Sequence, residues 1–287
     1  MQSAVTQMLK KYNCITTDNY KNALKEIIQE IALLGLHRID FFKKAAFYGG
    51  SALRIFHGLD RFSEDIDLSL LETDKNFDIT PCCEAINNEL KAFGFNMTVE
   101  KKEKSFDSAI ESAFIKGGTK LQIMNINSEI TGIEKLHRNE KLKIKLEIDT
   151  DPPKRADYEV KYQLTPVPYS VRLFDKPSLF SGKLHAVLCR NWGGGRSKGR
   201  DLYDYLWYLT QNIKPNFVHL SERMIQTGHL DSNQIITKEK LKYLLTEKFV
   251  KMDFKNLKKD VEPFIKDRRT LDLWSEEFFT SVTNDML

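Results

Sequence analysis

An α+β lobe followed by a helical lobe is the fold class that the sequence predicts, and three observations predict it. In the first half, short apolar or alternating segments that suit strands are interleaved with amphipathic helical segments. Pro152-Pro153 and a loop rich in Pro and Tyr over 162–169 then interrupt this pattern. From Ser178 onward the pattern is almost entirely helical. We therefore expect residues 1–170 to form a small mixed sheet flanked by helices, and residues 171–287 to form a helical bundle.

Composition describes an ordinary globular chain with no membrane segment. Of its 287 residues, 41% are hydrophobic and 29% are charged, and the net charge is +4. This mild positive charge permits a polyanionic partner without requiring one. The four cysteines contain no C-x-x-C pair, which favours free thiols in a reducing compartment. Because no apolar run reaches eighteen residues and the N-terminus has no export signal, we expect a cytoplasmic protein with no membrane partner.

The first lobe begins with helices and a strand that ends in a glycine turn. Apolar spacing predicts a helix over 18–35 with Gly35 as its stop, and a second helical stretch near 38–43. A strand over 45–48 runs into Gly49-Gly50, after which Ser51 can cap a helix that continues to Phe56. The other expected elements are a helix over 79–94 and strands over 95–100, 113–115, 120–125 and 143–149, with Gly117-Gly118 as a hairpin turn.

Two aspartates follow this turn on one face of a strand. Residues 65–70 alternate polar and apolar, so Asp65 and Asp67 point the same way. Closely set carboxylates suit a divalent ion such as Mg²⁺ or Mn²⁺. A glycine turn at a helix N-terminus can hold phosphates with its backbone N–H groups. For D-x-D alone a solvent-facing polar stripe is the simpler interpretation, but the turn just before it favours a metal and nucleotide site.

The residues around this turn also resemble a known family. Tyr48 to Leu53 reads YGGSAL, Arg61 to Asp67 reads RFSEDID, and thirteen residues separate Gly50-Ser51 from Asp65. This arrangement resembles the polymerase-beta-like nucleotidyltransferase superfamily and, more closely, the AbiEii/AbiGii toxin nucleotidyltransferases, a group that includes the mycobacterial MenT toxins. Residues 215–287 carry no part of the resemblance.

The resemblance implies a function and a set of partners. The expected reaction transfers a nucleoside monophosphate from an NTP to an acceptor, with release of pyrophosphate. The implied acceptor is the 3′ end of tRNA, whose extension stops translation, and a separate antitoxin protein opposes the toxin. The glycine turn of Gly49, Gly50 and Ser51 would hold the triphosphate.

The superfamily pattern calls for a third carboxylate on a neighbouring strand. Glu147 lies between two apolar residues in the predicted strand over 143–149 and is the preferred candidate, which gives Asp65, Asp67 and Glu147 as the metal ligands. Asp149 shares its strand face and is the alternative. Lys145 lies on the same face, where it would sit beside the phosphates.

The helical lobe is expected to complete the active-site cleft. These toxins carry a lysine at the start of a helix and an Arg-Asp pair at the start of the next, and Lys183 and Arg200-Asp201 match those positions. By this resemblance Lys183 holds the triphosphate and Asp201 assists at the acceptor or the metal, with Asp204 as the fallback. The glycine-rich loop before this pair carries cations that suit phosphate, or else serve only as a solvated linker: Arg196, Lys198 and Arg200.

Two other functions stay open at this stage. The same carboxylates would support transfer of a nucleoside monophosphate to a protein or small-molecule hydroxyl, and the chain could also be a catalytically silent nucleotide-binding module. Lysine clusters such as Lys258-Lys259 would contact the phosphates of tRNA, although most such clusters are solvated helix faces. The six histidines show no paired spacing, so no zinc site is expected.

Overall fold

The computed structural model describes residues 2–103, 108–119, 122, 140–190 and 198–287, and the chain divides into two compact units. The first unit is built from Met1–His57, Phe62–Pro152 and Val160–Leu173, and the second from Gly58–Arg61, Pro153–Glu159 and Phe174–Leu287. The two units are therefore interleaved in sequence. Within the described residues, no helix is long and apolar enough to cross a membrane.

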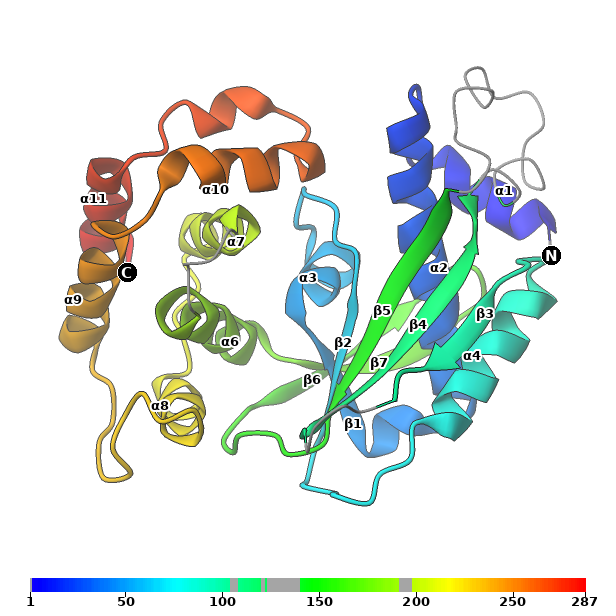
Figure 1. The fold of residues 1–287 in the computed structure, drawn as a ribbon, viewed down its shortest axis with the longest axis horizontal. Helices are drawn as coiled ribbons and strands as arrows, with labels where there is room; N and C mark the ends of the chain where they lie inside the picture. The colour runs from blue at the N-terminus through cyan, green and yellow to red at the C-terminus, as the bar shows by residue number, and fades with distance from the viewer. Residues whose placement is uncertain (1, 104–107, 120–121, 123–139, 191–197) are drawn as a thin grey trace. The chain divides into compact units, whose positions relative to one another are not determined.

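A seven-stranded mixed sheet forms the centre of the first unit, with strand order β3-β4-β5-β2-β1-β7-β6 (Figure 1). The central pair β2 and β5 is parallel, and so is the pair β1 and β7, whereas β1–β2, β3–β4 and β4–β5 are antiparallel. The strands are β1 (Ala45–Tyr48), β2 (Ile66–Leu70), β3 (Thr98–Lys101), β4 (Ile110–Gly118), β5 (Lys141–Asp149), β6 (Tyr158–Gln163) and β7 (Tyr169–Phe174).

Period-two alternation divides β2 and β5 into an apolar face and a polar face. Ile66 and Leu68 of β2 are fully buried in the core, as are the even-numbered residues of β5 that pair with them. Burial of each such side chain contributes about 1.5–3 kcal/mol to folding. The apolar face therefore fixes the register, and the register in turn fixes which face the carboxylates occupy.

The helices of the first unit are α1 (Gln2–Lys10), α2 (Thr17–Arg38), the 3₁₀ helix η1 (Phe41–Lys43), α3 (Gly49–His57) and α4 (Thr80–Ala92). A capping box at Thr16 starts α2, and α2 packs against α4. The expectation that Gly35 stops this helix is wrong. Gly35 lies inside α2, where an added Cβ would be 3.0 Å from the main-chain oxygen of Ala85 on α4. Glycine is used here for close helix packing.

Three other expectations for this unit need correction or fall outside it. Gly117 and Gly118 do not turn the chain but end β4, in register with Leu142 and Lys141. Nearly all of the expected strand over 120–125 lies outside the described residues. The expected loop over 162–169 is shorter than predicted, because β6 continues to Gln163 and β7 begins at Tyr169.

The second unit is helical, as the sequence predicts. Its elements are α6 (Lys176–Cys189), α7 (Gly199–Thr210), α8 (Phe217–Gln226), α9 (Lys238–Phe249), α10 (Phe254–Val261), η3 (Glu262–Phe264), η4 (Arg268–Leu271) and α11 (Glu276–Met286). Helix α6 packs on α7, α8 and α9, and α7 also packs on α10. The Phe180 ring stacks on Tyr208 with centroids 4.4 Å apart, and the Tyr205 hydroxyl bonds Thr283 in the interior. Tyr205 and Tyr208 of α7 are therefore part of the core of this unit.

Candidate active site

The parallel pair β2–β5 brings the predicted carboxylates of the first unit together. Asp67 is the register partner of Glu147, and Ser69 is the partner of Asp149. Neighbouring strands lie about 4.8 Å apart, so Asp67 and Glu147 are direct neighbours on one face. Asp65 directly precedes β2, two residues before Asp67. Of the two alternatives for the third carboxylate, Glu147 is therefore the cross-strand neighbour of Asp67, and Asp149 lies one pair further along.

The glycine turn packs against the Asp67 side chain. Strand β1 pairs with β2 so that Tyr48 faces Asp67, and the next residue, Gly49, has φ +80°. A Cβ added at Gly49 would overlap the Asp67 carboxylate oxygen and lie 3.1 Å from its Cγ. Only a residue without a side chain allows this approach at this backbone angle. The glycine turn and the Asp67 carboxylate are therefore in direct contact, and each restricts the position of the other.

Ser51 does not cap α3, in contrast to the prediction. The helix begins at Gly49, two residues earlier, and the buried Ser51 hydroxyl donates a hydrogen bond to the main-chain oxygen of Asp65. The first-turn N–H groups of α3 start at this turn and have no partner within the helix. The Ser51 side chain instead joins α3 to the residue that opens β2.

Gln29 is a further residue of this site that the sequence analysis missed. Its side chain is fully buried on α2, and its Nε2 donates to the main-chain oxygen of Ser63 at 3.1 Å. Ser51 Oγ and the Asp65 main-chain oxygen lie 3.5 Å from the same nitrogen. The sequence signal was weak, because Gln29 is followed by Glu30 and preceded by Glu26, so it resembles part of an exposed polar helix face. Gln29 and Ser51 together hold the chain on both sides of Glu64.

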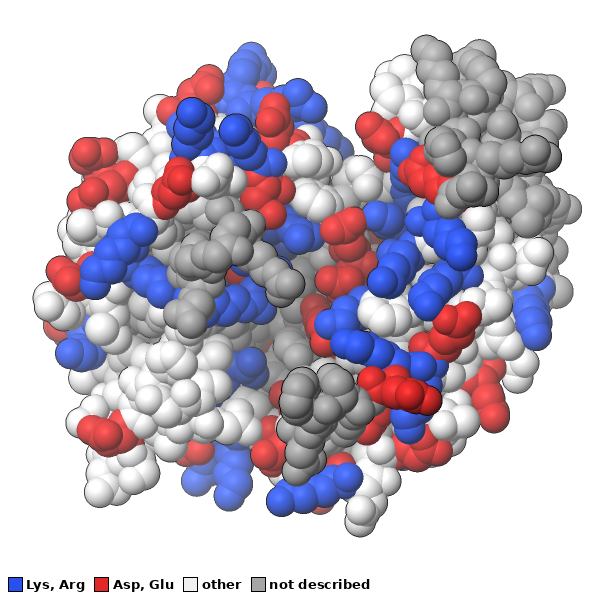
Figure 2. All heavy atoms as spheres, in the orientation of Figure 1, with Lys and Arg blue, Asp and Glu red and all other residues white. Residues whose placement is uncertain are grey.

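Lysines lie on the same face of the sheet as the carboxylates. Lys145 Nζ is 2.6 Å from Glu147 Oε1, and Lys143 Nζ lies 3.9 Å above the ring of Phe114 on β4. Lys116 is the register partner of Lys143. Figure 2 shows Lys and Arg side chains gathered over β4 and β5 beside acidic side chains. The odd-numbered positions of β5 thus run from lysines at its start to acids at its end.

In the second unit, Lys183 on α6 is held between two carboxylates of α7. Its Nζ is 2.7 Å from Asp201 Oδ1 and 2.7 Å from Asp204 Oδ2. Arg190 Nη1 lies 2.8 Å from the second oxygen of Asp201. Arg61 donates two hydrogen bonds of 2.6 Å to Asp204, from Nε to Oδ1 and from Nη2 to Oδ2. Both α7 aspartates therefore contact the predicted phosphate-binding lysine, and Asp204 is the fully buried one.

The charges of this network stabilise one another despite their burial. Burial disfavours the Asp201 carboxylate, but Lys183 and Arg190 outweigh it and hold its pKa at about 2. Burial also disfavours the Arg61 charge, yet Asp204 raises the Arg61 pKa above its ordinary value. In the sequence, Arg61 stands out only as the first residue of the RFSEDID motif. The structure shows that it is the bidentate partner of Asp204.

The glycine-rich loop is described only at its end. Arg196 lies outside the described residues, and Lys198 directly precedes α7. The guanidinium of Arg200 stacks 4.3 Å from the Phe264 ring, and its Nε is 3.9 Å from Asp260. Arg200 is therefore docked on the α10 region of its own unit.

Comparison with known proteins identifies the class: the chain is a nucleotidyltransferase. It belongs to the AbiEii toxin family, because the family model described as "Nucleotidyl transferase AbiEii toxin, Type IV TA system" matches residues 31–279. This confirms the resemblance and extends it over most of the C-terminal segment that the motifs did not cover. Membership of this family implies an NTP as substrate and an antitoxin as partner.

Solved structures that align with most of the chain were also found. MenT4, a nucleotidyltransferase toxin from Mycobacterium tuberculosis, is 12% identical with a TM-score of 0.48, covering 98% of this chain and 99% of that one. JHP933 from Helicobacter pylori is 16% identical with a TM-score of 0.46, covering 92% and 91%. No curated protein matches the chain. The functional assignment therefore rests on the family model.

Proposed function

We propose that this toxin is a metal-dependent enzyme that transfers a nucleoside monophosphate from an NTP to the 3′ end of tRNA. The observation that carries the proposal is the pairing of Asp67 with Glu147 beside the turn at Gly49. A carboxylate pair and a helix N-terminus at one point of a sheet supply separate places for a cation and for phosphates.

The carboxylate oxygens of Asp65, Asp67 and Glu147 suit a hard divalent ion, Mg²⁺ or Mn²⁺. The Gly49 position supports this fit, because it leaves room for the Asp67 carboxylate where any other residue would fill the space. The ion, when bound, neutralises charge that develops on the phosphoryl oxygens. Lys145 forms an ion pair with Glu147, and it would be placed to bind a phosphate if a cation were held by Glu147 instead.

The chain's own groups bind and orient the triphosphate. The first-turn N–H groups at Gly49 and Gly50 point out of the N-terminus of α3, where they favour anions. Ser51 fixes the main chain at Asp65 and so acts as a positioning residue. Lys183 binds the triphosphate through its positive charge. To do so, it leaves one of its two aspartate partners and pairs with a phosphate oxygen instead.

The basic side chains on the sheet support a polyanionic acceptor. The lysines of this stripe, which are half-buried or exposed and share one face with the carboxylates, are Lys116, Lys141, Lys143 and Lys145. An acceptor strand that runs along β5 would meet these cations before it reaches Glu147. Such contacts are electrostatic, so acceptor binding should weaken steeply with salt.

The test is incubation of the purified protein with Mg²⁺, each labelled NTP in turn, and total tRNA. We expect label at the 3′ end of tRNA with the unmodified chain and none with Asp67→Asn or Glu147→Gln. Asp149→Asn is the matched control on the same strand face and should retain most activity. Label on protein would assign a different acceptor. Loss of activity in Asp149→Asn but not in Glu147→Gln would reassign the third ligand.

A further inference from the structure

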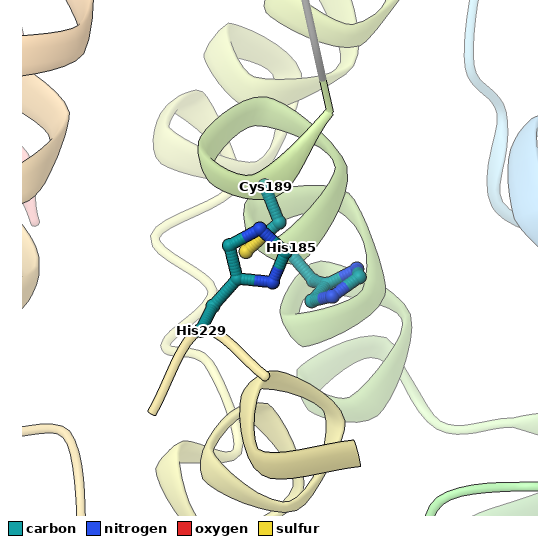
Figure 3. A group of neighbouring side chains, drawn as sticks. All are labelled: His185, Cys189 and His229. Carbon is teal, nitrogen blue, oxygen red and sulfur yellow. The ribbon is translucent and has the colours of Figure 1, made fainter. Parts of the chain in front are cut away.

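Two histidines and a cysteine form a cluster in the helical unit that the proposed reaction does not use. His185 and Cys189 are one helical turn apart on α6, and His229 follows the end of α8. One ligand atom from each side chain lies within 4.8 Å of the other two. Figure 3 shows the three side chains gathered beside α6, with His229 reaching them from the segment after α8. No zinc site was expected from the sequence, because the six histidines show no paired spacing, and His229 lies forty positions beyond Cys189.

Thr227 orients both imidazole rings of this cluster. Its hydroxyl lies 2.9 Å from His185 Nε2 and 2.9 Å from His229 Nδ1. When this hydroxyl donates to the main-chain oxygen of Arg223, 3.0 Å away, its lone pairs can accept an N–H from each ring. Each ring then keeps a lone pair on its other nitrogen, His185 Nδ1 and His229 Nε2. A metal-binding histidine usually donates its second ring N–H to an oxygen, and the Thr227 hydroxyl offers such an oxygen to both rings.

The chemistry of the three donors selects a class of metal. Two imidazoles and a thiolate suit a borderline-soft transition ion and are unsuited to Mg²⁺. We propose that His185, Cys189 and His229 bind a zinc-type divalent ion, with the fourth position taken by water or another small ligand. This site differs in donor type from the carboxylates of β2 and β5 and lies in the other unit.

The resting state of the donors is compatible with such a site. Burial, together with the nearby Arg223, lowers the pKa of His185 to about 3. Burial raises the pKa of the Cys189 thiol to about 11, while Lys248 and Arg223 oppose the shift. Metal binding would therefore release the thiol proton, which is the usual behaviour of a cysteine ligand.

The ion would act as a structural link within the helical unit. It would join the C-terminal half of α6 to the segment that follows α8, and these two helices already pack on each other. Because the ion binds the folded arrangement and not the unfolded chain, it should raise the thermal unfolding midpoint as its concentration rises. Lys183 lies on the same helix two residues before His185, so the link also restrains the helix that carries it.

The test measures metal binding to the full chain with an excess of Mg²⁺ present to fill the carboxylate site. We expect one Zn²⁺ per chain by elemental analysis, and Co²⁺ should give the absorption band of a thiolate-to-cobalt bond. Cys189→Ser should abolish that band, and His229→Ala should weaken Zn²⁺ binding at least tenfold. Thr227→Ala should weaken it about 10- to 100-fold, as loss of an orienting hydrogen bond does.

Two controls keep the result interpretable. Cys14→Ser removes a half-buried cysteine of the other unit and should leave both signals unchanged. His229 is exposed and outside the helices, so its replacement should leave the far-ultraviolet circular dichroism intact. The proposal is overturned if the unmodified chain binds no Zn²⁺ in excess Mg²⁺. It is equally overturned if the folded His229→Ala and Cys189→Ser variants bind Zn²⁺ as the unmodified chain does.

Discussion

Gly49→Ala tests two requirements of the turn: a backbone angle that favours glycine, and space for the Asp67 carboxylate. The alanine would stand at φ +80°, which costs about 1–2 kcal/mol for an L-residue. Its Cβ would also lie 3.1 Å from the Asp67 Cγ and closer still to a carboxylate oxygen. Ordinary contact needs about 3.5–4.0 Å, so the carboxylate must move by roughly 0.5–1 Å. A displacement near 1 Å in a reacting constellation costs about 100-fold in rate.

The matched control for this prediction is Gly94→Ala. Gly94 has φ +85°, but an added Cβ there would have no atom within 4 Å. Gly94→Ala should lose about 1–2 kcal/mol in urea unfolding from the backbone angle alone, and Gly49→Ala should lose at least as much because of the added overlap. Only Gly49→Ala should lose transfer activity, by about 100-fold in initial rate at saturating NTP. Equal activity of the two variants would refute the argument that the turn positions the Asp67 carboxylate.

Three further predictions concern buried polar groups. Ser51→Ala removes the hydroxyl that holds the main chain at Asp65, so kcat should fall at least tenfold while the KM for NTP changes little; an unchanged kcat would contradict the positioning role. Arg61→Met leaves the buried Asp204 without its bidentate partner, so the free energy of unfolding should drop by about 3–5 kcal/mol in urea titration; a change under about 1 kcal/mol would count against it. Burial raises the pKa of Glu30 from 4.5 to about 8, so its contribution to stability is present below pH 4.5 and is lost as pH rises towards 8. This loss in the free energy of unfolding is of the order of 3 kcal/mol by pH 7, and Glu30→Gln should remove it. If the free energy of unfolding of Glu30→Gln falls with pH as steeply as that of the unmodified chain, the assignment to Glu30 is refuted.

The sequence predicted the elements whose information is local. The D-x-D strand, the glycine turn and the strand with Glu147 each carry their signal within a few residues, and the structure pairs the two strands. The failures concern residues whose role is set by a distant partner. Gly35 is explained only by the helix packed against it, and Ser51 only by a main-chain oxygen fourteen residues later. Periodicity contains neither partner.

The histidine cluster was missed for a related reason. Motif rules search for ligands at short, fixed spacing, and only His185 and Cys189 meet that condition. The third donor is brought in by the packing of α8 on α6, which no spacing rule encodes. The sequence therefore shows two of the three donors, His185 and Cys189, as an i, i+4 pair. Only the tertiary structure reveals His229 as the third.

The network around Lys183 limits how this lysine can act. Its charge is already shared between Asp201 and Asp204, and removal of a buried charge from its partners costs several kcal/mol unless other cations remain. Arg190 and Arg61 are those cations, since each holds one of the two aspartates independently of Lys183. Both aspartates would therefore keep a cationic partner if Lys183 were to bind a phosphate, as proposed above. With Lys183, Arg190 and Arg61 on Asp201 and Asp204, the network holds three cations against two carboxylates, so it carries a net charge of +1.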